Sequence, residues 1–562
     1  MKNIRRFFSL FLSLILILCS ILPVSAKADC SCGALPVVYV SGFGATMLVD
    51  ENGGHAFPFS VQTLFSTLFT HAKEFDGKIL PVLADTCSDL MEPLRMNPDG
   101  TSYYPLRPVY ETAADTSLQG FKKNDALKSV PYTGSEFLDM QCVADEIGED
   151  HVFNFLFDWR LSSDENADAL LAYIQDVCSL TGHDRVRIYS ISQGCMIVAQ
   201  YLYKYADRGL VERVVFDTPV LGGTSLAADI FDFQTLALDY ENILLLVADI
   251  LHTELELSRV ASILPLDKIG NVVRMAAELV VLPPILYSPA FLEMIPQDRM
   301  DSIRKQWFSD GTYDDLWAKV DATRRGFMAD IPGTLRKAEA CGTKIFLKTC
   351  AGRNMLTQTD AYADGIVDVR YSCGAAVAPY GEVFPPEYKQ VKDIGRNCIS
   401  PDRTIDLSAG YLPERTWIVN GLFHGQVEID PVSYALVRTL LLTDTIQDAY
   451  SNPEYPQFLQ SGDPASDVCV TCRETNCLFL PQNGTRTLLL RNTSKRHILY
   501  VNGVTVDGQK TSVSPSVLLP GKSVVLTVPD GIGTFGKITV NYRQSLRLFR
   551  AQSRIFTYSV TA

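Results

Sequence analysis

The sequence predicts an α/β domain with a mostly parallel sheet, followed by a smaller all-β domain. In the first domain, short apolar runs alternate with amphipathic segments, a pattern typical of parallel strands covered by helices on both faces. Beyond residue 468 the hydrophobic period changes to two, and glycine-containing turns separate the runs, which indicates a sandwich. The chain has 562 residues, and this length also favours more than one domain.

The first 26 residues are predicted to be a signal peptide. Lys2, Arg5 and Arg6 form a basic start, residues 7–22 are apolar, and residues 24–26 are typical of a cleavage site. The alternative is that this segment is retained as a membrane anchor. No other stretch reaches the roughly 18 uninterrupted apolar residues of a spanning helix. We therefore expect a secreted, extracellular protein, or one that stays associated with the cell surface.

Charge and cysteine content narrow the choice of partners. Cleavage removes three basic residues and moves the formal net charge from −14 to −17, which argues against nucleic acid as a partner. Thirteen cysteines remain, an odd number, so at least one is expected to lie outside disulfides within the chain. Cys469 and Cys472 have the spacing of half a zinc site, but no second half with nearby histidines follows, so a disulfide or plain thiols are favoured there. We predict no metal and no cofactor.

The elements of the first domain follow one another along residues 27–450. The predicted strands cover 34–40, 152–157, 186–189, 211–216, 344–349 and 416–419, and the predicted helices cover 135–147, 195–205, 431–442 and a segment that begins with the capping box Ser162–Glu165. From 224 to 338 the alternation stops and the chain is helical and apolar, which predicts an inserted cap.

The C-terminal domain is expected over 469–562, after a proline-containing linker over 451–468. Its predicted strands cover 497–501, 504–506, 523–528, 537–542 and 555–560, with turns at Asn502-Gly503, Asp507-Gly508 and Pro520-Gly521. Alternating hydrophobicity favours a small β-sandwich. Binding, spacing and stabilisation are all open as its role.

The segment Ser190-Ile191-Ser192-Gln193-Gly194 joins a predicted strand to a predicted helix. This context predicts a nucleophile elbow of the α/β-hydrolase type, in which strained backbone exposes a serine hydroxyl above the sheet. Positions two before and two after the serine need small side chains because strand and helix pass closely there, and Ser190 and Gly194 meet that requirement. Ser192 is therefore the candidate nucleophile.

A serine nucleophile needs an imidazole base, and in this fold the base follows the last strand of the sheet. His424 lies just after the strand over 416–419 and before the helix over 431–442, as the base should. The other histidines downstream of the serine are His252, in the predicted cap, and His497, in the predicted sandwich. Both of these positions are disfavoured, so His424 is the candidate base.

The acid that orients the imidazole is expected between serine and histidine in the chain. Asp364 lies in a loop after the strand over 344–349, and the glycine that follows it lets the side chain turn back towards the site. Its competitors are Asp360 and Asp368. We expect Asp364 to be the acid.

The developing oxyanion needs backbone donors on two sides. One is expected to be the N–H of Gln193, directly after the nucleophile. The other is expected in the glycine turn after the first strand, at Phe43, with Gly44 as the alternative. Each donor typically contributes roughly 3 kcal/mol.

Several blocks of the sequence resemble the lecithin:cholesterol acyltransferase family, which includes the lysosomal phospholipase acyltransferases. These blocks are Pro36–Gly44, with Ser41 in place of the usual proline, Phe157-Asp158-Trp159-Arg160, Ile188–Gly194, Thr218–Gly223, Asp364–Val367 and Phe423-His424-Gly425. The resemblance covers roughly residues 34–445, in blocks, and the Asp-Trp-Arg block is the most specific. The gap from acid to base is longer than is usual in the family, and the β-sandwich has no counterpart in its animal enzymes.

The resemblance implies an α/β-hydrolase with a cap, acting as a serine hydrolase or O-acyltransferase on lipid esters, with Ser192 as nucleophile, Asp364 as acid and His424 as base. Asp158 and Trp159 then either contact substrate or support the floor of the active site. The apolar cap would shelter an acyl chain and touch a membrane surface. The alternative is a catalytically silent surface or binding protein whose β-sandwich provides the function.

Overall fold

The computed structural model describes residues 33–58, 61–72, 79–123, 140–231, 286–357, 359–427, 430–461, 468–472, 479–480, 486–492, 498–529, 531–532, 535–545 and 552–560. The predicted signal peptide, the middle of the predicted cap over 232–285, and both His252 and His497 lie outside these residues. Among the helices within the described ranges, none has the length and apolar character needed to cross a membrane.

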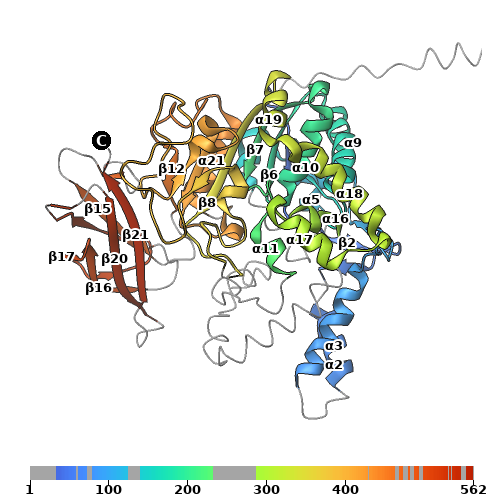
Figure 1. Ribbon diagram of the computed structural model, residues 1–562, viewed down its shortest axis with the longest axis horizontal. Coiled ribbons are helices and arrows are strands. Elements are labelled where there is room, and N and C mark those ends of the chain that lie inside the picture. The colour runs from blue at the N-terminus through green and yellow to red at the C-terminus, as the bar shows by residue number, and fades with distance from the viewer. Residues whose placement is uncertain are drawn as a thin grey trace, which may run out of the picture.

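The centre of the first domain is a seven-stranded sheet in which every neighbouring pair is parallel. Its strands are β1 (Val37–Val40), β5 (Val152–Phe155), β6 (Val186–Ile191), β7 (Val211–Asp217), β8 (Lys344–Ala351), β11 (Thr416–Asn420) and β12 (Phe458–Gln460). They lie in the order β12-β11-β8-β7-β6-β1-β5, so β1 lies between two strands that follow it in the sequence. Figure 1 labels β6, β7, β8 and β12 of this sheet. This topology is the α/β-hydrolase arrangement that the sequence predicts.

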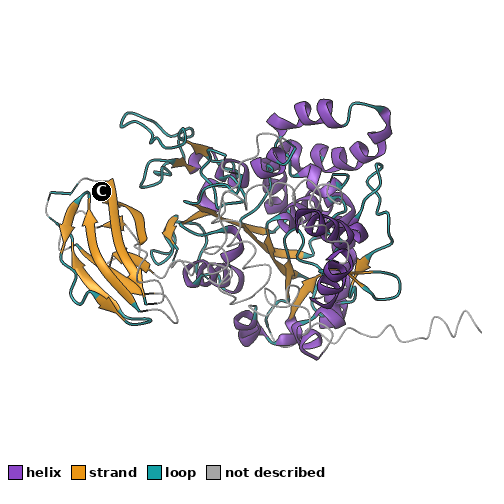
Figure 2. Cartoon of the chain, turned by 90° about the horizontal axis from the view of Figure 1, so that it is seen from below, coloured by secondary structure: helices purple, strands orange, loops and turns teal. Residues whose placement is uncertain are grey.

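Both faces of the sheet are buried, which explains why its strands are continuous apolar runs. Alternate residues point to opposite faces: Val38 and Val40 join one apolar cluster, whereas Val37 and Tyr39 join another. The first cluster includes α9 (Ser163–Thr181), α10 (Gln193–Tyr205) and α19 (Ile331–Ala340), and the second includes α5 (Leu118–Lys123), α8 (Gln141–Ile147) and α21 (Pro431–Leu442). Figure 2 shows the helices on both sides of the central strands.

Three insertions extend this core. After β1 come β2 (Leu48–Val49), β3 (His55–Phe57), β4 (Arg107–Pro108), α2 (Val61–Ala72), α3 (Ile79–Met91) and α4 (Ala113–Thr116), and α2 and α3 project side by side from the domain (Figure 1). The described parts of the predicted cap are helical: α11 (Ser225–Asp229), α16 (Pro289–Glu293), α17 (Gln297–Trp307) and α18 (Asp314–Arg325). Between β8 and β11 lie α20 (Val369–Cys373), β9 (Ala376–Val377) and β10 (Ile405–Asp406).

The seventh strand lies inside the segment that the sequence predicts to be a linker. β12 pairs in parallel with β11, with Ile418 opposite Phe458. The prolines at 453 and 456 precede this strand instead of interrupting it, and β12 lies at the edge of the sheet, where proline is tolerated nearby. The sheet therefore extends to residue 460, beyond the boundary at 450 that composition indicates.

The C-terminal part of the chain forms the two sheets of the predicted sandwich. One sheet contains β13 (Val468–Cys472), β15 (Thr487–Asn492) and β19 (Ser523–Thr527); the other contains β14 (Phe479–Leu480), β16 (Leu499–Val506), β17 (Gln509–Thr511), β18 (Val517–Leu518), β20 (Phe535–Gln544) and β21 (Gln552–Val560). Val524 and Leu526 of β19 enter the shared apolar core, whereas Val525 between them is exposed. This is the period of two that predicts a half-buried strand.

One predicted turn of the sandwich is instead a β-bulge. Where β16 advances two residues, from Val501 to Gly503, its partner β20 advances only one, so Asn502 is an extra residue. The turn expected at Asn502-Gly503 is therefore wrong, because a bulge absorbs one residue while the strand continues. The turn at Asp507-Gly508 is present, and its residues have φ of 50° and 77°, as a tight hairpin turn requires.

Candidate active site

Ser192 occupies the sharp turn between β6 and α10. Its φ is 54° and its ψ is −122°, a conformation that is costly for any residue with a side chain and that the surrounding structure must enforce. Its backbone N–H donates to the carbonyl of Asp217, at the end of β7, at 3.1 Å. Ser192 is half-buried, whereas Ile191 and Gln193 on either side are buried. The turn therefore presents the hydroxyl at the end of the sheet.

Two glycines allow the backbone to pass close to this turn. A Cβ on Gly194 would lie 2.4 Å from the carbonyl oxygens of both Val40 and Ser41, because α10 begins directly against the end of β1. A Cβ on Gly42 would lie 3.1 Å from the Cβ of Ser192. The small residue expected two positions after the serine is therefore a steric requirement, and the loop after β1 runs beside the serine side chain.

Asp364 and His424 are hydrogen-bonded to each other. Asp364 is fully buried; its Oδ2 lies 2.8 Å from Nδ1 of His424, and its Oδ1 accepts from the backbone of Ile366 and Val367 at 3.0 and 2.8 Å. The backbone N–H of His424 also donates to the Asp364 carbonyl at 3.0 Å. Because a carboxylate oxygen only accepts, this geometry assigns a proton to Nδ1 and orients Nε2 as the acceptor.

The competing acids lie elsewhere. Asp368 is buried, and its carboxylate accepts from the backbone N–H and the hydroxyl of Ser225, both at 2.8 Å, which ties the acid loop to the first helix of the cap. Burial raises the pKa of Asp368, an effect that these hydrogen bonds oppose. Asp360 is exposed. Of the three carboxylates weighed from the sequence, the structure places Asp364 at His424.

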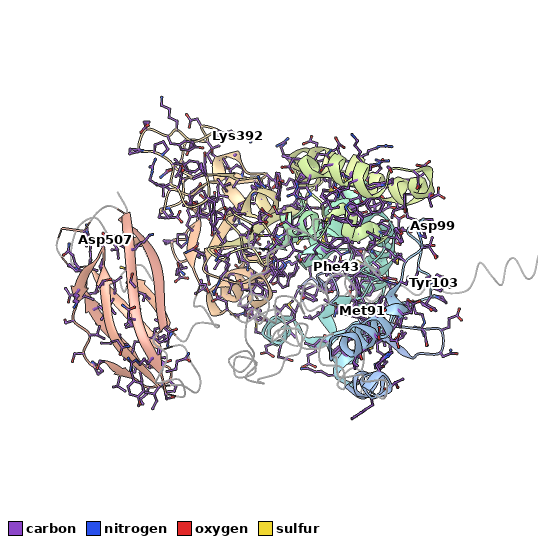
Figure 3. The ribbon with its side chains drawn as sticks, turned by 60° about the horizontal axis from the view of Figure 1, so that its bottom comes forward. Phe43, Met91, Asp99, Tyr103, Lys392 and Asp507 are labelled. Atoms are coloured by element: carbon purple, nitrogen blue, oxygen red, sulfur yellow. The ribbon has the colours of Figure 1, made fainter. Side chains whose placement is uncertain are left out.

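The residues expected to bind an oxyanion lie on both sides of the serine. The N–H of Gln193 belongs to the first turn of α10, where backbone donors have no acceptor within the helix. Phe43 lies in the turn closed by the Ala45 N–H and the Gly42 carbonyl at 3.3 Å, and within the described ranges its own N–H donates no hydrogen bond. Gly44, the alternative donor, has φ 75°. Phe43 is partly buried, and Figure 3 labels it in the first domain.

Trp159 of the Asp158-Trp159-Arg160 block contacts both Phe43 and Gln193. The ring of Trp159 packs edge-on against Phe43, with centroids 4.6 Å apart, and the Trp159 carbonyl accepts from the side-chain amide of Gln193 at 2.9 Å. Arg160 is fully buried and pairs with Asp158 at 2.7 Å. Trp159 is only 2% exposed and Asp158 only 6%, which favours the supporting role over substrate contact; the role itself stays a prediction.

The topology brings the serine, the aspartate and the histidine to one edge of the sheet. Ser192, Asp364 and His424 follow β6, β8 and β11, and the C-terminal ends of parallel strands meet at the same edge. Asp217 ends the strand between β6 and β8, binds the backbone of Ser192 and lies close enough to His424 for the imidazole to affect its ionisation.

The sequence alone does not single out one charged pair beside this edge. Asp217 Oδ1 lies 2.7 Å from Nζ of Lys348, and both side chains are completely buried. Burial raises the pKa of Asp217, and the adjacent ammonium opposes that effect; the Asp217 carboxylate in turn raises the pKa of Lys348 against the effect of its own burial. The only hint of this pair in the sequence is that Lys348 follows the three apolar residues 345–347 of β8.

The described residues contain no group of three or more histidine, cysteine or acidic side chains arranged to hold a metal ion. Cys195, one residue beyond the small glycine of the turn, is completely buried, and burial raises the pKa of its thiol. It therefore packs as an apolar residue, in agreement with its position in an apolar helix.

No model of a known protein family matches the chain, and no curated protein matches it. Among solved structures it is similar to the mature Bacillus licheniformis lipase BlEst2, at 10% identity over 73% of this chain and 93% of that one, with a TM-score of 0.26. It is also similar to the Tle4–Tli4 complex (12%, 73% and 98%, TM-score 0.33) and to phospholipase PlaB from Legionella pneumophila (10%, 93% and 90%, TM-score 0.30). At these low scores, the fold assignment rests on the sheet topology itself.

Proposed function

We propose that the protein is an exported serine hydrolase or O-acyltransferase that acts on lipid esters, with Ser192 as nucleophile, His424 as base and Asp364 as acid. The observation that carries the proposal is the hydrogen bond of Asp364 to Nδ1 of His424, at the same sheet edge as the strained turn at Ser192. A serine hydroxyl is unreactive at neutral pH until an oriented imidazole takes its proton, and this arrangement supplies both parts.

In the proposed cycle Ser192 attacks the ester carbonyl while Nε2 of His424 takes the hydroxyl proton. The backbone N–H groups of Gln193 and Phe43 stabilise the oxyanion, and the proton then passes to the departing alcohol. This leaves an acyl group on Ser192. Water or a second alcohol, activated by His424, attacks the acyl-enzyme and regenerates the free serine, so hydrolysis and acyl transfer differ only in the acceptor.

A substrate with an apolar acyl group is supported by a series of packed aromatic side chains that runs from the loop after β1 into the described part of the cap. Phe43 packs on Phe291 with centroids 6.1 Å apart, Phe291 on Phe231 at 6.3 Å, and Phe231 on Trp307 at 5.7 Å. The resemblance of the sequence blocks to lipid acyltransferases points to the same substrate class. Contact of the cap with a membrane surface belongs to this proposal.

A fluorophosphonate probe tests the proposal, because it labels only an activated serine. We expect the mature protein to be labelled and Ser192→Ala to remain unlabelled. Absence of labelling in the wild type, or equal labelling of both proteins, would favour the catalytically silent binding protein. Product analysis with a phospholipid donor, with and without a long-chain alcohol or sterol, then separates a hydrolase from an acyltransferase.

A further inference from the structure

Asp217 and Lys348 form a fully buried ion pair that none of the proposed catalytic steps uses. Besides the 2.7 Å contact to Lys348, Asp217 accepts from the hydroxyl of Tyr189 on β6 at 2.9 Å. The Lys348 ammonium also donates to the hydroxyl of Ser433 in the first turn of α21. The pair therefore links three strands of the sheet to the helix that follows His424.

The backbone atoms of the same residues hold the serine turn. The carbonyl of Asp217 accepts the N–H of Ser192 at 3.1 Å, and the carbonyl of Lys348 accepts the N–H of Thr218 at 2.8 Å. Thr218 has φ 41°, a second strained residue directly after β7. A shift of either charged residue would therefore move the support on which the serine turn rests.

At its other end the pair reaches the start of α21, the helix that follows His424 in the chain. The Ser433 N–H donates to Asp430 Oδ1 at 2.8 Å, and Asp430 Oδ2 accepts from Ser461 at 2.8 Å beside β12. Asp430 thereby caps the start of α21, six residues after His424. A buried series of polar contacts thus joins the Ser192 turn to the start of α21, the helix that follows His424 in the chain.

A buried ion pair is weak evidence for stability, because desolvation of two charges costs about as much as their attraction returns. An apolar pair of similar volume would fill the same space at similar stability. The location of this pair, at the one sheet edge where the serine and the histidine meet, therefore points to a role in the site.

We propose, on the basis of the proposed function, that Asp217 and Lys348 are positioning residues that fix the Ser192 turn relative to His424 while their opposite charges cancel at the imidazole. Neither residue touches substrate. The pair places charge beside the base without biasing its protonation, which a single buried charge would do.

The other charged or titratable groups near His424 in the described residues, which include Arg353 bound to the Gly421 carbonyl at 2.9 Å, are the same in the wild type and in every variant of the pair. Asp364 is bound to Nδ1, and the Asp430 carboxylate lies close enough to Lys348 to raise the pKa of its ammonium. Cys350, next to them on β8, is completely buried, and burial raises the pKa of its thiol well above the ordinary value, so it stays neutral. Removal of one member of the pair thus leaves one uncancelled charge near His424.

The test compares Lys348→Met, Asp217→Asn and the double variant by the pH dependence of kcat/KM on a soluble ester. In Lys348→Met the remaining carboxylate favours the imidazolium, so we expect the acid limb to move to higher pH by on the order of half a unit or more. In Asp217→Asn the remaining ammonium of Lys348 disfavours the imidazolium, so we expect the acid limb to move to lower pH. A purely structural role cannot produce opposite shifts.

In the double variant we expect an acid limb close to that of the wild type and a kcat reduced on the order of tenfold at unchanged KM, because only the positioning is lost. Lys344→Met, at the start of the same strand and half exposed, is the matched control and should resemble the wild type. If the single variants do not fold, kcat of the double variant decides: a wild-type value overturns the inference.

Failure of this inference is distinguishable from failure of the proposed function. Equal or same-direction shifts in the two single variants, in a protein whose wild type is labelled by the fluorophosphonate, overturn only the role of the pair. A wild type that is neither labelled nor active overturns the proposed function, and the inference with it.

Discussion

Two fully buried carboxylates of the first domain, Asp364 in the acid loop and Glu293 in the cap, lie in opposite environments. Asp364 accepts from two backbone N–H groups and from an imidazole, which can become a cation. The Glu293 carboxylate accepts only from Ser163 and Thr323 within the described residues, and burial raises its pKa to about 8. One environment is built to hold a negative charge beside a base, whereas the other favours a neutral acid that joins the cap to α9.

The largest expected effect on turnover comes from substituting Asp364 or its partner His424. His424→Ala should lower turnover by about 10³-fold or more, and Asp364→Asn by a comparable factor, because the triad acts as a unit. Steady-state kinetics on a soluble ester measures both. Glu293→Gln, at an equally buried carboxyl whose hydrogen-bond partners Ser163 and Thr323 are not members of the triad, is the control and should retain activity. Near-normal hydrolysis by His424→Ala would mean that another residue is the base.

Substitution of Gly194, which packs beside the serine, should reduce activity nearly as much as substitution of the triad. In Gly194→Ala the new methyl group would lie within 2.4 Å of the Val40 carbonyl oxygen, so α10 or β1 must shift, and we expect a loss of about 1–3 kcal/mol in stability together with loss of labelling. Urea unfolding and fluorophosphonate labelling measure these effects. Gly503→Ala is the control, since a Cβ there meets nothing within 4 Å. Equal effects of both substitutions would contradict the steric argument.

Removal of a side chain that supports the oxyanion donors should have a smaller effect on kcat. Gln193→Ala keeps the backbone donor but removes the hydrogen bond to the Trp159 carbonyl, so we expect kcat to fall on the order of tenfold with little change in KM. Gln200→Ala in the same helix removes buried hydrogen bonds to Asp164 and to the backbone of Phe327, away from the site. It should lower stability and leave kcat unchanged; a fall in kcat of the same size would assign both effects to helix α10 as a whole.

The sequence predicts most of the central sheet because buried parallel strands are continuous apolar runs, and the capping box at Ser162 and Glu165 forms as expected. Local composition could not reveal β12, because a three-residue edge strand is recognised by its partner β11 and not by its own residues. The same holds for Asn502, where pairing with β20 turns an expected hairpin turn into a bulge.

Within the candidate site, chain order and loop position were enough to choose Asp364 over Asp368, and the structure places only the former at His424 among these two. The catalytic roles themselves stay a prediction until they are measured. The Asp217–Lys348 pair could not be predicted, because its members belong to different strands and only the parallel alignment of β7 with β8 brings them together.

The smallest expected effect tests the neutral environment through the pH dependence of stability. An unfolded glutamate titrates near 4.5, and burial raises the pKa of Glu293 to about 8, so the folded state binds more protons between these values. The contribution of Glu293 to the free energy of unfolding is therefore complete below about pH 4.5. It is lost as the pH rises through about 8, at up to roughly 1.4 kcal/mol per pH unit. Glu293→Gln cannot titrate, so its urea midpoint should fall less between pH 5 and 9 than that of the wild type, whereas Glu111→Gln, at an exposed position, should follow the wild type. Equal pH slopes for wild type and Glu293→Gln would mean that Glu293 is ionised in the folded protein, and the contrast with Asp364 would then lie in hydrogen-bond partners alone.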